Sequence, residues 1–268
     1  MENPALIRNF REGFPRGYTV VTREDETACG TGVEFGVLRM KAGEVIQQTD
    51  PRETAWIILR GKIEIESDGR RCVLELRSLF DEGASVFHAP GGLRVAIKAV
   101  SADAEVAIAR TSNSRQFEPR LFLPDPAGAE RRGEGLVQGA CLRQVRVLFD
   151  HRNRPESNLV IGEVVNSPGR WSSYPPHHHD QPEIYHYRFT EPQGYGHAEL
   201  GEDVYRVQNF DTLKITDRKD HAQVSAPGYG MYYLWIVRHL PGNPYRGFEF
   251  TKEHSWILDP KSQGWIPK

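Results

Sequence analysis

Short apolar runs, each bounded by turn residues, recur along the first half of the chain. The runs are rich in Val, Ile or aromatic residues, which is typical of β-strands. They lie at residues 33–40, 54–59, 61–66 and 104–109. Turns that contain Gly interrupt them about every eight to twelve residues. This rhythm predicts antiparallel strands arranged as a jelly roll or barrel, the folds built from many short strands.

A second series of apolar runs follows a polar stretch with Pro and Gly at residues 123–135. Its candidate strands are residues 144–149, 159–165, 183–189, 211–215, 221–225 and 231–237. We place a domain boundary in the polar stretch, which divides the chain into residues 1–125 and 126–268. The expected fold is therefore all-β, with two tandem barrels. Helix signals are weak, and only residues 4–11 and 129–133 are predicted to form a helical turn or two.

The clearest chemical pattern lies in the sequence PPHHHDQPE. Residues two apart on an extended chain point to the same side, so His177 and His179 are predicted to project together while His178 points away. The following Asp-Gln-Pro can turn the chain back, and the next strand then begins with Glu183. A carboxylate can therefore join the two imidazoles.

His221 begins another predicted strand after the polar residues 217–220. An antiparallel barrel readily returns this strand beside the first two, which makes His221 the expected fourth ligand. Three neutral imidazoles and one carboxylate suit one divalent ion of Zn, Fe, Mn, Co or Ni, and the spacing does not choose among them. The competing interpretation is a solvated, histidine-rich loop without a metal.

The remaining histidines lack this spacing. His186 has the opposite parity to Glu183 in its strand, so we expect a structural role for it. Surface or core roles suffice for His88, His151, His197, His239 and His254. Because residues 30–115 contain only His88, no second metal centre of this type is predicted in the first domain.

Charge and cysteine content favour a soluble protein that binds a small molecule. The 34 Lys and Arg residues nearly balance the 36 Asp and Glu residues, so neither nucleic-acid nor membrane binding is predicted. The first residues contain no apolar segment typical of a secretion signal, and we expect a cytoplasmic location. The three cysteines, Cys29, Cys72 and Cys141, are far apart and odd in number, which argues against a disulfide framework.

These motifs resemble those of a known family. HxHxxxE followed by a distant His is similar to the metal motif of the cupin superfamily, and two barrels in tandem resemble a bicupin. More narrowly, SSYPPHHHD, EIYHYRFTEPQGYG, APGYGMYYLWIV and FEFTKEHSWI resemble the 5-deoxy-glucuronate isomerase family of inositol catabolism. EFGVLRMKAGE resembles that family's first domain. The resemblance covers nearly the whole chain and implies two cupin-like jelly-roll barrels, with the metal site in the second.

The resemblance also implies an activity, a metal-dependent aldose–ketose isomerisation of 5-deoxy-glucuronate to 5-dehydro-2-deoxy-gluconate. The partner is then a sugar acid, and the cofactor is one divalent ion, Zn, Mn or Fe. Tyr185 and Tyr187 share the parity of Glu183 and are the candidate catalytic residues. Arg188 and Gln193 match positions of family motifs and are candidate substrate contacts, although Arg188 needs a bulge or twist to face inward. Assembly into a homo-oligomer is left open.

Three other functions stay open. A related uronate isomerase is one, because the motifs depart from the family pattern in the short spacing from His179 to Glu183 and in the residues around His221. A bicupin dioxygenase is another, since three His and one Glu can also hold Fe(II). The third is a sugar-acid binding module without catalysis, because a fold does not determine a function.

Overall fold

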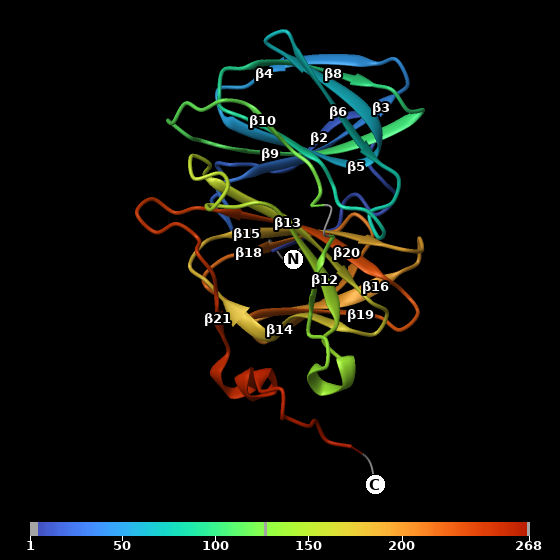
Figure 1. Ribbon diagram of the computed structural model, residues 1–268, viewed down its shortest axis with the longest axis vertical. Coiled ribbons are helices and arrows are strands. Elements are labelled where there is room, and N and C mark those ends of the chain that lie inside the picture. Colours follow the sequence, from blue (N-terminus) through green and yellow to red (C-terminus); the bar gives the residue numbers. More distant parts are fainter. Residues whose placement is uncertain (1–4, 126–127, 267–268) are drawn as a thin grey trace.

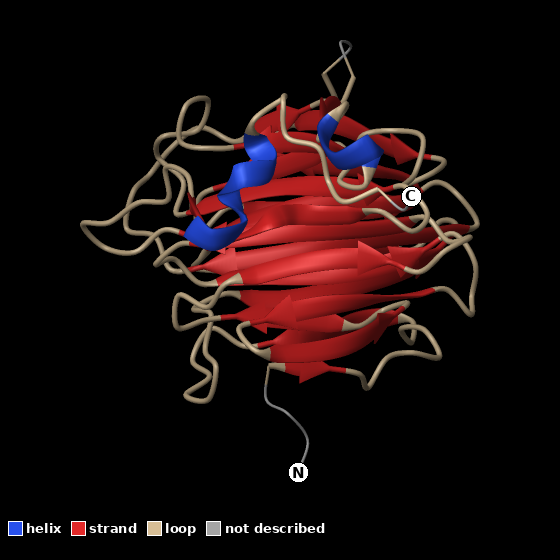
Figure 2. Ribbon diagram, turned by 90° about the horizontal axis from the view of Figure 1, so that it is seen from below, coloured by secondary structure: helices blue, strands red, loops and turns tan. Residues whose placement is uncertain are grey.

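The protein consists of two β-barrels stacked along its long axis (Figure 1). The computed structural model describes residues 5–125 and 128–266. Regular structure in these residues is almost entirely β-strand, as the sequence predicted. The 3₁₀ helices η1 (Leu136–Gly139) and η2 (Lys252–Leu258) lie on one outer face, which is turned to the viewer in Figure 2. In this described part of the chain, no helix is long and apolar enough to cross a membrane.

The first barrel is built from strands β2 to β10, which join in one nine-stranded sheet of the described residues. The long strand β5 pairs with β6, β7, β8 and β9, so it takes part in both walls of the barrel. The strands are β2 (Gly17–Thr22), β3 (Glu34–Lys41), β4 (Val45–Thr49), β5 (Glu53–Ser67), β6 (Arg70–Leu76), β7 (Val86–Ala89), β8 (Arg94–Ala99), β9 (Asp103–Thr111) and β10 (Arg120–Phe122).

The second barrel has two walls. Within the described residues, one wall is a seven-stranded sheet in the order β1-β18-β15-β20-β13-β12-β11, and the other is a five-stranded sheet in the order β17-β16-β19-β14-β21. The strands are β1 (Leu6–Ile7), β11 (Glu130–Arg132), β12 (Arg143–Phe149), β13 (Leu159–Asn166), β14 (Trp171–His178), β15 (Glu183–Phe189), β16 (Tyr195–Leu200), β17 (Asp203–Gln208), β18 (Thr212–Ile215), β19 (His221–Ser225), β20 (Met231–Arg238) and β21 (Glu249–Phe250).

The N-terminal segment belongs to a sheet of the second barrel. Although it precedes the first barrel, β1 pairs with β18 of the second, with Leu6 opposite Leu213. The helix predicted at residues 4–11 is wrong over the described residues 5–11, and Pro4 lies outside them. The reason is the non-local pairing, which buries Leu6 (6% exposed) and satisfies its backbone at the edge of a sheet.

The polar stretch at residues 123–135 follows β10 and contains β11. The helical turn predicted at residues 129–133 is wrong, because residues 130–132 form β11 and pair with β12. Here again a neighbouring strand provides hydrogen bonds that outweigh a weak local preference for helix.

The two barrels share a hydrophobic core where they meet. Apolar residues of β3, β5 and β9 belong to the same buried cluster as residues of β13, β15 and β20. On β15, Ile184 belongs to this shared cluster, whereas Tyr185 and Tyr187 belong to a second cluster inside the second barrel. Successive side chains of a strand point to opposite faces, so β15 forms part of the contact between the barrels and of the second barrel's interior.

A buried polar network also joins the barrels. Glu53, at the start of β5, accepts a hydrogen bond from Nε2 of His88 (2.7 Å), and Nδ1 of His88 accepts one from Arg154 of the second barrel (2.9 Å). The other carboxylate oxygen of Glu53 accepts from Asn113 (2.7 Å) and from the backbone of Asn158 (2.9 Å). Burial would raise the pKa of Glu53, but the contacts with His88, Ser157 and the backbone of Asn158 together outweigh it and leave that pKa below its ordinary value.

Removal of this carboxylate should destabilise the protein strongly. Glu53→Ala leaves the donors of His88, Asn113 and Ser157 and the backbone N–H of Asn158 without their acceptor, which should cost about 3 kcal/mol of unfolding free energy. Denaturant unfolding followed by tryptophan fluorescence measures the change. Glu75→Ala, which breaks a solvent-exposed pair with Lys62, is the matched control and should lose much less. Equal losses in the two variants would contradict a stabilising role for the interdomain network.

Candidate metal centre

Three strands of the second barrel bring the predicted ligands together. β14 ends with His177 and His178, β19 begins with His221, and antiparallel pairing places His177 opposite His221. His179 directly follows β14, and Glu183 is the first residue of β15. Because β14 and β19 belong to one wall and β15 to the other, the cluster lies between the two sheets of the barrel.

His179, Glu183 and His221 form a compact group. Oε2 of Glu183 lies 3.2 Å from Nε2 of His179 and 3.5 Å from Nε2 of His221. One possible ligand atom from each of the three residues lies within 4.8 Å of the others. His177 lies beside this group, with its ring centroid 4.3 Å from that of His221 and 6.5 Å from that of His179.

The hydrogen bonds of the cluster fit a metal ion. Nδ1 of His221 donates to the carbonyl of Lys219 (3.1 Å), which leaves the lone pair of Nε2 directed toward Glu183. Nε2 of His221 and Nδ1 of His179 are buried without a hydrogen-bond partner. An unpartnered buried nitrogen is costly, and a divalent cation between Nε2 of His221 and the Glu183 carboxylate would remove that cost. The donor set suits Zn, Mn or Fe.

Burial favours the neutral form of the ligand imidazoles. His221 is fully buried and His177 is 7% exposed. Burial lowers the pKa of His221, and burial followed by the neighbouring rings of His221 and His179 lowers the pKa of His177 well below its ordinary value. Neutral imidazole is the form that binds a metal.

His178 and His186 lie away from the cluster, as strand alternation predicted. Nδ1 of His178 lies 2.6 Å from Asp220, on the outer side of β14. His186 is buried in the contact between the barrels, where its Nδ1 lies 2.8 Å from the hydroxyl of Thr212 and its ring packs on Phe35.

Tyr185 and Tyr187 face the interior of the second barrel. The ring of Tyr185 lies 5.8 Å from that of His221, and its hydroxyl lies 3.3 Å from Oγ of Ser173. The hydroxyl of Tyr187 donates to Gln223 (2.6 Å), deeper along the strand. Burial raises the pKa of both tyrosines well above the ordinary value, so both phenols are protonated.

Arg188 and Gln193 are not brought to the cluster. Arg188 points to the first barrel, where its guanidinium donates to Glu105 and to Nε2 of His186. The bulge that would turn it inward is absent, because β15 pairs with β18 and β20 without a register shift. Gln193 is exposed in the turn after β15, at the end of the strand remote from Glu183.

A segment that contains none of the predicted site residues covers the cluster. Residues 239–248, between β20 and β21, form this cover segment. The ring of Tyr245 lies 4.9 Å from that of His179, and the ring of Phe248 lies 4.2 Å from that of His177. The sequence spacing of these aromatic residues does not predict a contact with the ligands, because the contact depends on how the chain returns after β20.

A cavity of about 370 Å³ opens beside the cluster. Its wall includes His179, the outer side of His178, Arg218 and part of the cover segment. A larger hollow of about 810 Å³ lies near the junction of the barrels, lined in part by Arg146 and Glu82, and includes none of the predicted ligands. Of these two cavities, only the smaller one includes a predicted ligand, His179.

Comparison with known proteins decides the family. Residues 6–257 match the model of the KduI/IolB family. The chain belongs to this family. Curated relatives named 5-deoxy-glucuronate isomerase include one from Geobacillus kaustophilus, 28% identical over 251 residues and covering 85% of this chain and 87% of that protein. Another, from Bacillus subtilis, is 27% identical over 254 residues, covering 85% of this chain and 89% of that protein.

Solved structures agree in fold. An IolB-like protein from Salmonella typhimurium superposes with a TM-score of 0.81 at 24% identity, covering 92% of this chain and 97% of that one. A mutant of oxalate decarboxylase from Bacillus subtilis superposes with a TM-score of 0.63 at 13% identity, covering 88% of this chain and 76% of that one. The predicted family and the predicted all-β, cupin-like fold are confirmed.

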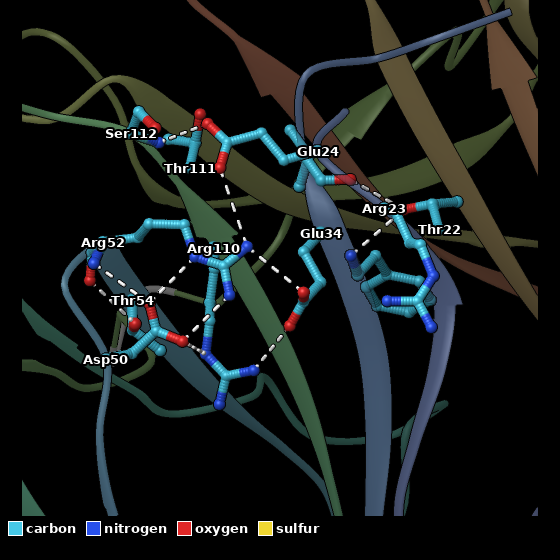
Figure 3. Close-up of polar contacts among 12 residues, drawn as sticks. Thr22, Arg23, Glu24, Glu34, Asp50, Arg52, Thr54, Arg110, Thr111 and Ser112 are labelled. Carbon is cyan, nitrogen blue, oxygen red and sulfur yellow. Dashed lines mark hydrogen bonds and ion pairs between the residues drawn. The ribbon is translucent and has the colours of Figure 1, made fainter. Parts of the chain in front are cut away.

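The first barrel of this KduI/IolB protein holds a different polar cluster (Figure 3). Its carboxylates are bound by arginines: Glu34 lies 2.7 Å from Arg110 and 3.1 Å from Arg52, and Asp50 lies 2.8 Å from Arg52. Burial would raise the pKa values of Glu34 and Asp50, but the arginine contacts outweigh it and lower both. Within the described residues, the His179 group is the only cluster identified that could hold a metal.

Substitution of single ligands should release the metal. His177→Ala, His179→Ala, Glu183→Ala and His221→Ala each leave an incomplete set of donors and should lower bound metal to well below one ion per chain after gel filtration. Elemental analysis measures this, and His178→Ala is the matched control that keeps its metal. If His178→Ala strips the metal and His177→Ala does not, the assigned strand alternation is wrong.

The chain should bind one metal ion. The first barrel holds its carboxylates in arginine contacts, and its His88 is occupied by Glu53 and Arg154. Elemental analysis of the loaded protein should therefore give about one tightly held divalent ion per chain. Two equivalents that survive dialysis would place a second centre in the first barrel.

Proposed function

We propose that this protein is a metal-dependent aldose–ketose isomerase that converts 5-deoxy-glucuronate to 5-dehydro-2-deoxy-gluconate. The observation that carries the proposal is the buried group of His179, Glu183 and His221, whose imidazoles have unpartnered nitrogens, in a chain of the KduI/IolB family. The name shared by the curated relatives supplies the substrate.

His177, His179, Glu183 and His221 would hold the ion. A divalent ion supplies Lewis acidity, which lowers the pKa of a C–H bond beside a carbonyl and stabilises negative charge on the adjacent oxygens. This chemistry suits an isomerase, because an aldose becomes a ketose when one proton leaves the hydroxyl-bearing carbon and another reaches its neighbour. No net oxidation occurs, and no dinucleotide is needed.

Protonated side chains beside the cluster can donate to the sugar oxygens. Tyr185 is the catalytic residue under this proposal, because its protonated Oη faces the interior beside His221 and can donate to a sugar oxygen. The hydroxyls of Tyr233 and Ser173 lie 3.2 Å apart, and the Ser173 hydroxyl also lies 3.3 Å from that of Tyr185. Tyr187 acts as a positioning residue, since its hydroxyl is engaged by Gln223.

The cover segment excludes water from the reaction. Tyr245 and Phe248 close over the rings of His179 and His177, so the ligand imidazoles face an apolar surface on that side. Exclusion of water strengthens electrostatic interactions inside the site and protects a reactive intermediate. A small sugar acid is the partner, and a cytoplasmic location forms part of the proposal, in agreement with three free cysteines.

The metal-loaded protein should convert 5-deoxy-glucuronate in deuterated buffer and incorporate deuterium beside the carbonyl of the product. Solvent label enters because the proton that returns to carbon exchanges on its way. NMR follows product and label together. A chelator should abolish turnover and added divalent metal restore it, while His221→Ala is inactive and His178→Ala remains active.

Other outcomes separate the alternatives. Product without deuterium would indicate hydride transfer or a shielded base. Oxygen consumption coupled to turnover would favour a dioxygenase. Conversion of a different uronate would favour a related uronate isomerase. Tight binding of a sugar acid without turnover would favour a binding module.

A further inference from the structure

Hydrogen bonds anchor the cover segment to the metal centre. Gln181, in the turn between the ligands His179 and Glu183, donates to the backbone carbonyl of Asn243 (2.8 Å) and to its side chain (3.1 Å). Asn243 in turn donates to Asp180 (2.9 Å). The same short turn therefore holds two ligands and the cover segment.

Arg246 lies between two residues that contact ligand imidazoles. Tyr245 packs on His179 and Phe248 packs on His177, so the chain at Arg246 is held close to the cluster from both sides. Gly247, with φ of 150°, allows a bend between Arg246 and Phe248 that a side chain would strain. Arg246, Gly247 and Phe248 all belong to the cavity wall.

The other charged groups of the cavity wall are already paired. Arg218 lies 3.2 Å from both Asp180 and Glu249, and Glu249 lies 3.4 Å from His178. Among the residues that the structure describes, Arg246 is the charged member of this wall without an ionic partner, and it is exposed. An unpaired guanidinium beside a metal cluster is suited to an anionic ligand group.

We infer that Arg246 binds the carboxylate of the sugar acid at the end remote from the reacting carbons. The inference rests on the proposed function and adds the residue that distinguishes an aldose acid from a neutral aldose. A guanidinium can donate two parallel hydrogen bonds to a carboxylate, which fixes orientation as well as charge. Arg246 thereby holds one end of the substrate while the other end faces the His and Glu ligands.

The test compares an acid with its neutral counterpart. The metal-loaded protein is titrated calorimetrically with D-gluconate and with D-glucitol, and the KM for 5-deoxy-glucuronate is measured in parallel. Arg246→Ala should weaken gluconate binding and raise KM by about 10- to 100-fold, because a hydrogen-bonded charge pair is lost. Glucitol binding should not change, and kcat should change less than KM.

Two further variants complete the test. Arg246→Lys keeps the charge without the planar fork and should fall between the unaltered protein and Arg246→Ala. Arg16→Ala removes an exposed arginine directly before β2 of the first barrel. It should leave both titrations and the KM unchanged. Elemental analysis of each variant confirms that the metal is retained.

The outcomes distinguish this inference from the proposed function. Unaltered gluconate affinity and KM in Arg246→Ala overturn the role of Arg246, even when isomerase turnover is normal. Equal weakening of gluconate and glucitol binding also overturns it, because the substitution would then have changed the shape of the cavity and not a contact with the carboxylate. Absence of turnover in the unaltered metal-loaded protein overturns the isomerase proposal, while the gluconate titration still decides whether Arg246 binds a carboxylate.

Discussion

The alternation of side chains along β15 is the constraint on which the site and the domain contact both depend. Every residue of this strand is buried. Glu183 and Tyr185 point into the second barrel, whereas Ile184, His186 and Arg188 point to the first. A shift of one residue in register would exchange these faces, turning Glu183 away from the other ligands and putting the Arg188 charge among the tyrosines inside the second barrel. The contact between the barrels therefore also fixes the direction of Glu183.

The first barrel thus acts as a support for the metal centre. Its apolar outer surface packs on the wall that contains β15, and its buried Glu53 accepts hydrogen bonds that connect it to the second barrel. The pair of Arg188 and Glu105 adds a buried ionic contact across the same surface. Buried charges tolerate little displacement because each needs its partner, so these contacts favour one relative placement of the barrels.

Local periodicity explains why much of the site could be predicted from the sequence. The common direction of His177 and His179, the opposite direction of His178 and the outward face of Arg188 all follow from a period of two within single strands. The strands β1 and β11 were missed because their stability comes from pairing, in the case of β1 with a strand more than 200 residues away. The cover segment was missed for the same reason, since the contact of Tyr245 with His179 depends on the course of the whole chain.

The cover segment links substrate recognition to the chemistry of the ligands. Tyr245 and Phe248 remove water from one side of His179 and His177, and burial is the first cause of the lowered pKa of His177. A neutral imidazole is the form that a metal needs, so apolar covering and metal affinity are coupled. Arg246 occupies the same ten-residue segment, and Gln181 ties that segment to the turn between the ligands. An anionic group at Arg246 would therefore stabilise the arrangement in which the imidazoles are covered, because both depend on one anchored piece of chain.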